Sequence, residues 1–378
     1  MPELPAPLML VVDPGRPSAP AGSYAAIASA GQGVLSAELS RRLGAAGAIV
    51  TRLPVFAEPA SPFHWGAWFT AAARAARREE HVAGRPGETI GYAGAGSLAL
   101  LGDEALATLI SPPTGGVVAN NRYSADAFAL SGDVDAALDT LSACDTDNAA
   151  VRRLEEAGLA SQDLGASDWS RFDVDTPLDL ALLRLATRLP GTRVLDGMVT
   201  AFLEDARLPN GGGLEVPHLA AIGEVIRSRE AQLLVAGRIP SSAWSYLETE
   251  SACRVRCFIE ERGMRSSRDH VPRSLLADWV DRLGPADLIG ELASLADAVI
   301  LDSRVLMAAR AGSSDAVAWP PEEERFASDF GDGARVSTGW LAELTSAAAA
   351  ASVPVLLGGH ALVSDGLRLL VDAAWLGR

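Results

Sequence analysis

The chain has 378 residues, of which 48% are hydrophobic and 6% aromatic, enough apolar material for the cores of two domains. Its formal net charge of −16 argues against a protein that follows a nucleic-acid backbone or binds an anionic membrane surface. No uninterrupted apolar run of about 18 residues is present to span a membrane, and Met1 to Pro7 lacks the basic and then apolar stretches of a signal peptide.

All 32 basic residues are arginine, because the sequence contains no lysine. This excludes a Walker-A lysine, a Schiff-base lysine and a general-base lysine. An anionic group must therefore be held by arginine, by backbone N–H groups or by a metal. The three cysteines, Cys144, Cys253 and Cys257, match no zinc-site spacing, so we expect reduced thiols in a cytoplasmic protein.

Apolar runs and helical patterns alternate along the first half of the chain. We predict strands at 8–12, 48–53, 88–93, 116–119 and 127–130. We predict helices at 34–46, 63–78, 99–110, 133–143 and 148–157, and a further helix after residue 176. The alternation predicts an α/β domain with a largely parallel sheet.

Two polar loops of this half are candidate ligand contacts. The first strand ends in Asp13, and the loop that follows contains Gly15 and Arg16. Asn120 and Asn121, with Asp126 shortly after, lie between two apolar strands and could bind a base edge or ribose hydroxyls; the alternative is an ordinary turn.

The most informative stretch is Phe172–Leu180, which reads Phe-Asp-Val-Asp-Thr-Pro-Leu-Asp-Leu. Thr176, Pro177 and Asp179 suit the first turn of a helix closed by a capping box. Capping does not explain Asp173 and Asp175. On a strand their side chains point to the same side, as ligands of a divalent cation would.

This stretch resembles the closing motif of small nucleotidyltransferases with a GT-A-like, Rossmann-type fold, the group of the molybdenum-cofactor and phospholactate guanylyltransferases. The resemblance covers only about the first half of the chain. It implies a nucleotide-binding domain in which acidic residues reach the nucleotide site, with Mg²⁺ held at Asp173 and Asp175 and with Asp175 in the catalytic role.

The resemblance also implies roles for the two earlier loops. Asp13 and Gly15 would line the nucleotide site, and Arg16 would replace the family's basic residue at the triphosphate. Ser97 stands where active relatives carry the aspartate that holds the catalytic metal, and the usual glycine run of the first loop is absent. A nucleotide-binding protein without transferase activity therefore remains an alternative.

A Pro- and Gly-containing break at 188–193 predicts a boundary between a nucleotidyltransferase-like domain, 1–190, and a second α/β domain, 191–378. In the second domain we predict strands at 231–239, 253–259, 296–301 and 353–357. Helices are predicted at 195–206, 216–229 and 241–249, in the stretch after residue 273, and from about residues 286, 337 and 361. The predicted fold is thus two three-layer, Rossmann-like domains with mostly parallel sheets.

Each predicted strand of the second domain ends in polar residues, and ligands of open α/β sheets bind at the carboxyl ends of strands. We expect these residues to converge on one rim, with Gly358 and Gly359 offering backbone N–H groups to an anion. The residues are Arg238, Glu260, Glu261, Arg262, Asp302, Arg304, Gly358, Gly359 and His360.

Three functions remain open from the sequence. The first is transfer of a nucleotidyl group from a nucleoside triphosphate to a small phosphorylated acceptor, with Mg²⁺. The second is binding of a nucleotide or phosphorylated metabolite without catalysis. The third places the reaction in the second domain, with His360 as acid or base and the arginines holding an anionic substrate. The sequence does not fix the oligomeric state.

Overall fold

The computed structural model describes residues 5–15, 19–54, 63–85, 87–165, 169–261 and 270–376. The chain forms two compact units: a first unit of Met1–Pro17 and Ser29–Val174, and a second unit of Ser18–Ala28 and Asp175–Arg378.

The division between the units falls before helix α6 (Pro177–Ala186), whereas the sequence predicted a boundary after it, at residue 190. The physical reason is the packing of α6 inside the second unit. A side chain added at Gly358 would meet Leu178, and one added at Gly366 would meet Leu182, so α6 lies close against these two backbone positions.

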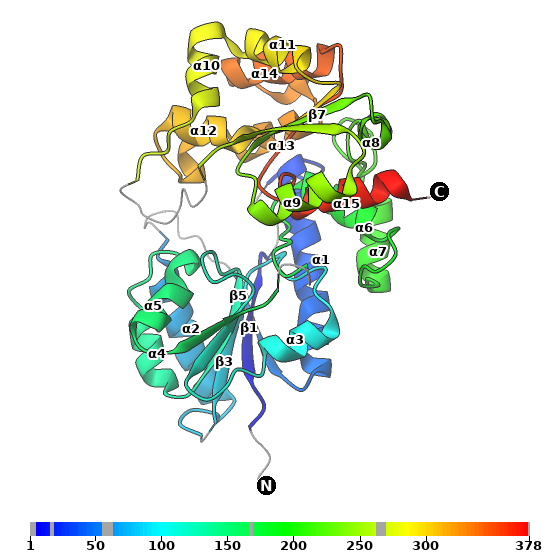
Figure 1. Ribbon diagram of the computed structural model, residues 1–378. Helices are drawn as coiled ribbons and strands as arrows, with labels where there is room; N and C mark the ends of the chain where they lie inside the picture. Colours follow the sequence, from blue (N-terminus) through cyan, green and yellow to red (C-terminus); the bar gives the residue numbers. More distant parts are fainter. Residues whose placement is uncertain are drawn as a thin grey trace. The chain divides into compact units, whose positions relative to one another are not determined.

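The first unit contains a mixed six-stranded sheet in the order β2-β1-β3-β5-β4-β6 (Figure 1). Its strands are β1 (Leu8–Asp13), β2 (Ile49–Pro54), β3 (Thr89–Ala93), β4 (Gly116–Ala119), β5 (Ala127–Ser131) and β6 (Ala160–Asp163). Strand β5 runs antiparallel to both of its neighbours, β3 and β4, while the other pairs are parallel. The sequence predicted the first five strands but not β6, a polar edge strand whose residues are mostly exposed.

Helices pack on both faces of this sheet, which makes three layers (Figure 1). They are α1 (Tyr24–Ala45), α2 (Trp65–Glu79), α3 (Asp103–Leu109), α4 (Val134–Leu141) and α5 (Ala150–Glu156). Alternate residues of β1 divide between the two cores, as the pleat of a strand requires. Leu10 joins the core with Phe69 of α2, and Met9 joins the core with Leu43 of α1.

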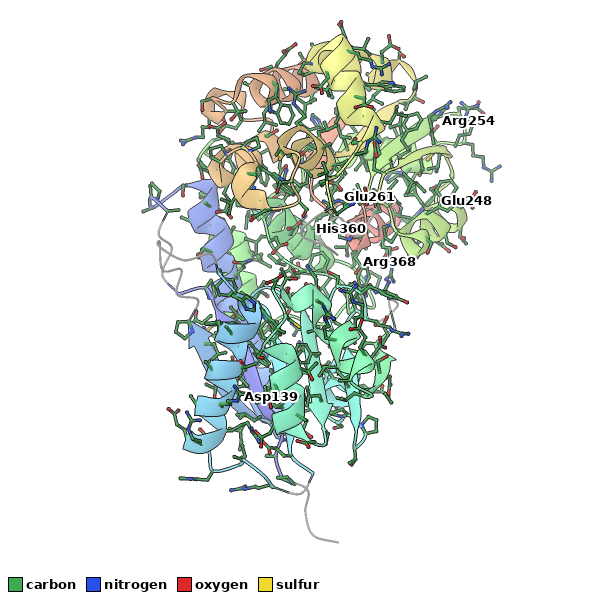
Figure 2. All side chains as sticks on the ribbon, turned by 90° about the vertical axis from the view of Figure 1, so that its left-hand side faces the viewer. Asp139, Glu248, Arg254, Glu261, His360 and Arg368 are labelled. Carbon is green, nitrogen blue, oxygen red and sulfur yellow. The ribbon has the colours of Figure 1, made fainter. Side chains whose placement is uncertain are left out.

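The second unit contains a parallel four-stranded sheet in the order β10-β9-β7-β8. Its strands are β7 (Gln232–Gly237), β8 (Arg254–Ile259), β9 (Ala298–Asp302) and β10 (Val355–Gly358). All four were predicted from their apolar runs. Exposed charges such as Arg254 of β8 and Glu248 project from the surface of this unit (Figure 2).

Helices α10, α11 and α14 lie above this sheet in Figure 1, and α9 and α15 lie below it. Besides α6, the helices are α7 (Gly197–Asp205), α8 (Leu219–Arg227), α9 (Ser241–Glu250), α10 (Leu275–Leu283), α11 (Pro285–Ser294), α12 (Ser303–Ala311), α13 (Glu322–Asp329), α14 (Gly339–Ala350) and α15 (Asp365–Trp375). The sequence predicted neither α12 nor α13. No helix among the described residues is both long and apolar enough to cross a membrane.

Two local predictions were wrong. Asp173 and Asp175 do not lie on a strand, because residues 172–175 form no regular structure; the Val174 carbonyl accepts a hydrogen bond from the Gln32 side chain at 2.9 Å. Helix α1 begins at Tyr24 and not near Val34, and its buried first residue, Tyr24, stacks on Phe330 with 5.6 Å between ring centroids.

Candidate functional site

An ion pair joins the carboxyl end of β1 to β2. Asp13 lies 3.0 Å from the guanidinium of Arg52 and also accepts the backbone N–H of Gly15 at 3.0 Å. Strand β2 pairs with one side of β1 and β3 with the other, so the strands that follow β1 in the chain are added on opposite sides of it. Ligands of open α/β sheets bind at such switch points. Arg16, predicted to contact the triphosphate, lies outside the described residues.

The turn after β3 packs against the closing motif. The Ser97 hydroxyl donates to the Gly94 carbonyl at 2.8 Å and thereby closes the turn, and its side chain is buried. Gly96 has a φ of +86°, and a Cβ there would lie 2.3 Å from the Val174 carbonyl oxygen. Glycine is therefore required for the turn to approach the motif this closely.

Asp173 and Asp175, the predicted metal ligands, flank the buried Val174; Asp173 is half-buried and Asp175 is exposed. Among the described residues, no group of three or more His, Cys, Asp or Glu side chains could hold a metal ion. Proteins commonly hold Mg²⁺ with one or two carboxylates together with phosphate oxygens of the substrate. The residues present thus fit Mg²⁺ only when a phosphorylated ligand supplies the remaining oxygens.

The side chain of Asn120 stabilises its own loop through hydrogen bonds. It is buried, its amide donates to Asp126 at 3.2 Å and to the Ser170 carbonyl at 3.1 Å, and its side-chain oxygen accepts the Ala127 N–H at 3.0 Å. Asn121 accepts the Tyr123 N–H at 3.2 Å, the geometry of a turn. The turn interpretation accounts for these contacts, because the hydrogen-bonding groups of the Asn120 side chain are used within the first unit.

The start of α6 in the second unit forms the predicted capping box. The Thr176 hydroxyl accepts the Asp179 N–H at 3.2 Å, and Asp179 Oδ2 accepts the N–H groups of Thr176 and Asp175 at 2.9 and 3.1 Å. The other carboxyl oxygen of Asp179 is buried with no hydrogen-bond partner among the described residues. Burial, followed by the nearby charge of Asp175, raises the pKa of Asp179 to about 7.

The end of β9 carries a buried ion pair with the residue that follows β7. Asp302 is fully buried and receives two hydrogen bonds from the Arg238 guanidinium, at 2.6 and 3.1 Å. Burial alone would raise the pKa of Asp302, but the charge and hydrogen bonds of Arg238 hold it below its usual range. Gly237 has a φ of +134°, and a Cβ there would lie 2.3 Å from that of Asp302.

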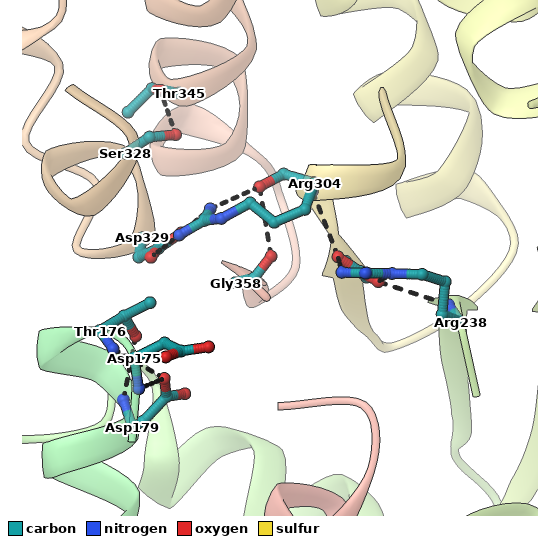
Figure 3. A network of polar contacts seen from close by, with 11 residues as sticks. Asp175, Thr176, Asp179, Arg238, Arg304, Ser328, Asp329, Thr345 and Gly358 are labelled. Carbon is teal, nitrogen blue, oxygen red and sulfur yellow. Dashed lines mark hydrogen bonds and ion pairs between the residues drawn. The ribbon is translucent and has the colours of Figure 1, made fainter. Parts of the chain in front are cut away.

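A second buried pair joins α12 to α13 (Figure 3). Arg304 donates to the two carboxyl oxygens of Asp329 at 2.7 and 2.6 Å, and both side chains are buried. Burial raises the pKa of Asp329, while the charge of Asp329 and its hydrogen bonds keep Arg304 protonated in spite of its burial. The Ser303 hydroxyl donates to the Gly358 carbonyl at 3.2 Å, which links β10 to the same network.

The predicted rim of the second unit therefore exists in part. Arg238 and the Arg304 N–H both donate to Asp302, the Arg304 guanidinium donates to Ser303, and Ser303 donates to Gly358, so these residues form one connected network. Gly359 lies against the Arg304 side chain. Both arginines are paired with buried carboxylates. Their role is therefore to stabilise the structure around the carboxyl ends of the strands, whereas the sequence predicted that they bind an anion.

The other predicted rim residues contribute differently. His360 is exposed (Figure 2). Glu260 caps α10 by accepting the Ser274 hydroxyl and the Leu276 N–H, at 2.8 and 3.1 Å. Glu261 pairs with His270 at 2.6 Å. Arg262 lies outside the described residues.

Sequence reasoning missed four residues that matter for these sites: Gln32, Arg52, Asp179 and Asp329. Arg52 lies inside β2, two residues before the strand ends, so no strand-end position marked it in the sequence. Asp179 was interpreted only as a cap, and nothing in the sequence marks its burial. A search with protein-family models gives no match to this chain, and a search among curated proteins gives none either.

Proposed function

We propose that the first unit binds a nucleoside triphosphate at the carboxyl ends of β1 and β3 and transfers its nucleotidyl group to a small phosphorylated acceptor. The proposal follows from the resemblance of the closing motif to that of the GT-A-like nucleotidyltransferases. One observation carries it: the turn at Gly96 packs directly on the Val174 carbonyl. This contact joins the closing motif to the loop after β3, which neighbours β1 in the sheet.

The charges of the first unit supply the groups that such a reaction requires. Phosphoryl-type transfer depends on positioning and charge neutralisation more than on a covalent nucleophile. Arg52, whose side chain is 41% exposed and pairs with Asp13, would supply a cation near the end of β2, in place of the lysine that this sequence lacks. Asp173 would supply a carboxylate to Mg²⁺, and the ion would neutralise the triphosphate when bound.

A thermal-shift titration with ATP, GTP, CTP and UTP, each with and without Mg²⁺, tests the binding step. A ligand at 100 times its Kd stabilises the folded state by about 2.7 kcal/mol. We expect one nucleotide to raise the melting temperature in a Mg²⁺-dependent way, and Asp173→Asn and Arg52→Ala to reduce this shift. Asp139→Asn is the matched control, because this exposed carboxylate pairs with Arg74 (Figure 2).

Pyrophosphate release then tests the transfer step. Binding without pyrophosphate release, across a panel of phosphorylated acceptors, would support a nucleotide-binding protein that has lost transferase activity, as Ser97 in place of an aspartate suggests. A panel in which no nucleotide shifts the melting temperature of the wild type contradicts the proposal for the first unit.

A second candidate function is acid–base chemistry at the strand ends of the second unit. The observation that favours it is the buried carboxyl group of Asp179 in the first turn of α6, where burial raises the pKa to about 7, in the range that suits general acids and bases. Because Arg238 and Arg304 are already paired, an uncharged substrate fits better than an anionic one. A metabolite whose thermal shift is present in the wild type and absent in Asp179→Asn would support this candidate.

A further inference from the structure

The second unit contains a pocket of about 240 Å³ whose lining includes none of the site residues predicted from the sequence. It is lined by the end of α13, by α14, by β10 and by the two residues before α8. The lining residues are Pro217, His218, Ser328, Asp329, Phe330, Gly331, Ala348, Ala349, Val355 and Leu357. Its volume lies below the roughly 300–1,000 Å³ of pockets for drug-sized ligands, so its ligand is smaller than a nucleotide.

Seven of the ten residues that line the pocket are apolar. Val355 and Leu357 are two residues apart on β10 and therefore point to the same face of the sheet. Ala348 of α14 is buried beside them, and the Phe330 ring is held in place by its stacking on Tyr24. Such a wall accommodates a compact aliphatic or aromatic group.

The polar residues of the pocket wall are already satisfied. The carboxylate of Asp329 is fully buried, and both its oxygens accept hydrogen bonds from Arg304. The hydroxyl of Ser328 lies 2.7 Å from that of Thr345 (Figure 3). These groups present no unbalanced charge to a ligand.

His218 at the rim of the pocket differs in conformation and exposure from the buried polar residues of the wall. His218 is exposed and adopts a left-handed conformation, with φ 56° and ψ 16°, which is uncommon for residues other than glycine. Backbone strain of this kind is concentrated at functional sites. His218 is also the N-cap of α8, and its side chain makes no capping hydrogen bond, so the helix begins directly after this lining residue.

We propose that this pocket binds a small apolar monocarboxylate. The apolar body lies against Phe330, Val355 and Leu357. The carboxylate accepts hydrogen bonds at the rim, from the His218 imidazole and the first N–H groups of α8. The partial positive charge of the helix N-terminus favours an anion at this position. This inference concerns the second unit and stands independently of nucleotide binding by the first.

Benzoate is the probe, and benzamide and benzylamine are its neutral and cationic counterparts of similar size. Isothermal titration of the full chain should detect millimolar benzoate binding that is at least about tenfold tighter than that of either counterpart. Ala349→Trp should fill the pocket and abolish binding. Ser245→Trp is the matched control, because this exposed residue of α9 does not line the pocket.

His218→Gly separates a ligand contact from a structural role. Glycine adopts the left-handed conformation without strain, so this variant should fold at least as well as the wild type. We expect it to bind benzoate about tenfold more weakly, with an unchanged melting temperature or a higher one. The proposal is overturned if benzoate does not bind at millimolar concentration, if benzamide or benzylamine binds as tightly, or if His218→Gly leaves the affinity unchanged.

Discussion

Asp179→Asn tests whether burial of this carboxyl group makes the stability of the second unit depend on pH. Asparagine has nearly the same shape, and its side-chain oxygen can still accept the N–H groups of Asp175 and Thr176, as Asp179 Oδ2 does. What the substitution removes is the ionisation. The pKa of Asp179 is about 7 in the folded chain, against 3.8 as the ordinary value.

The sign of the effect follows from these two values. A carboxyl group with a raised pKa binds its proton more tightly in the folded state, so the free energy of unfolding falls as pH rises from 3.8 towards 7 and then levels off. Each pH unit within this window contributes about 1.4 kcal/mol. Between about pH 5.5 and pH 8 the wild type should therefore lose about 2 kcal/mol through this one group.

Urea unfolding followed by tryptophan fluorescence at these two pH values measures the difference. We expect the wild type to lose about 2 kcal/mol more than Asp179→Asn over the interval. Asp133→Asn is the control, since asparagine also caps helices and this exposed N-cap of α4 lies in the first unit. The control should keep the pH dependence of the wild type. Equal pH dependence in the wild type and Asp179→Asn would refute the reasoning.

Three further substitutions test other contacts by urea unfolding. Arg304→Ala leaves the Asp329 carboxylate buried without its partner and should cost about 3–5 kcal/mol; a cost below about 1 kcal/mol would contradict this assignment. Gly96→Ala forces a Cβ onto the Val174 carbonyl oxygen and should cost at least about 1–3 kcal/mol, whereas Gly102→Ala, with open space around it, should cost far less. Asn120→Ala removes three hydrogen bonds of a buried amide and should cost about 2–4 kcal/mol, and full stability of this variant would show that the loop needs no brace.

The sequence alone determined nine of the strands and the capping of α6. Apolar runs bounded by turn residues are local signals, and the strands they predicted are present. The Thr-Pro-x-Asp pattern at Thr176 likewise specifies a helix start through bonds between close neighbours, and both bonds of the box are formed. Strand β6 was missed because it is polar and depends on pairing with β4.

Only the tertiary structure decided how the polar strand ends are used. The sequence placed Arg238 and Arg304 at the ends of strands, but their pairing with Asp302 and Asp329 joins residues tens of positions apart. It also could not show that Asp179 is buried, because burial results from the packing of α6 within the second unit. An ion pair or a raised pKa depends on groups that are far away in the sequence but close in space, and local sequence patterns do not show which groups these are.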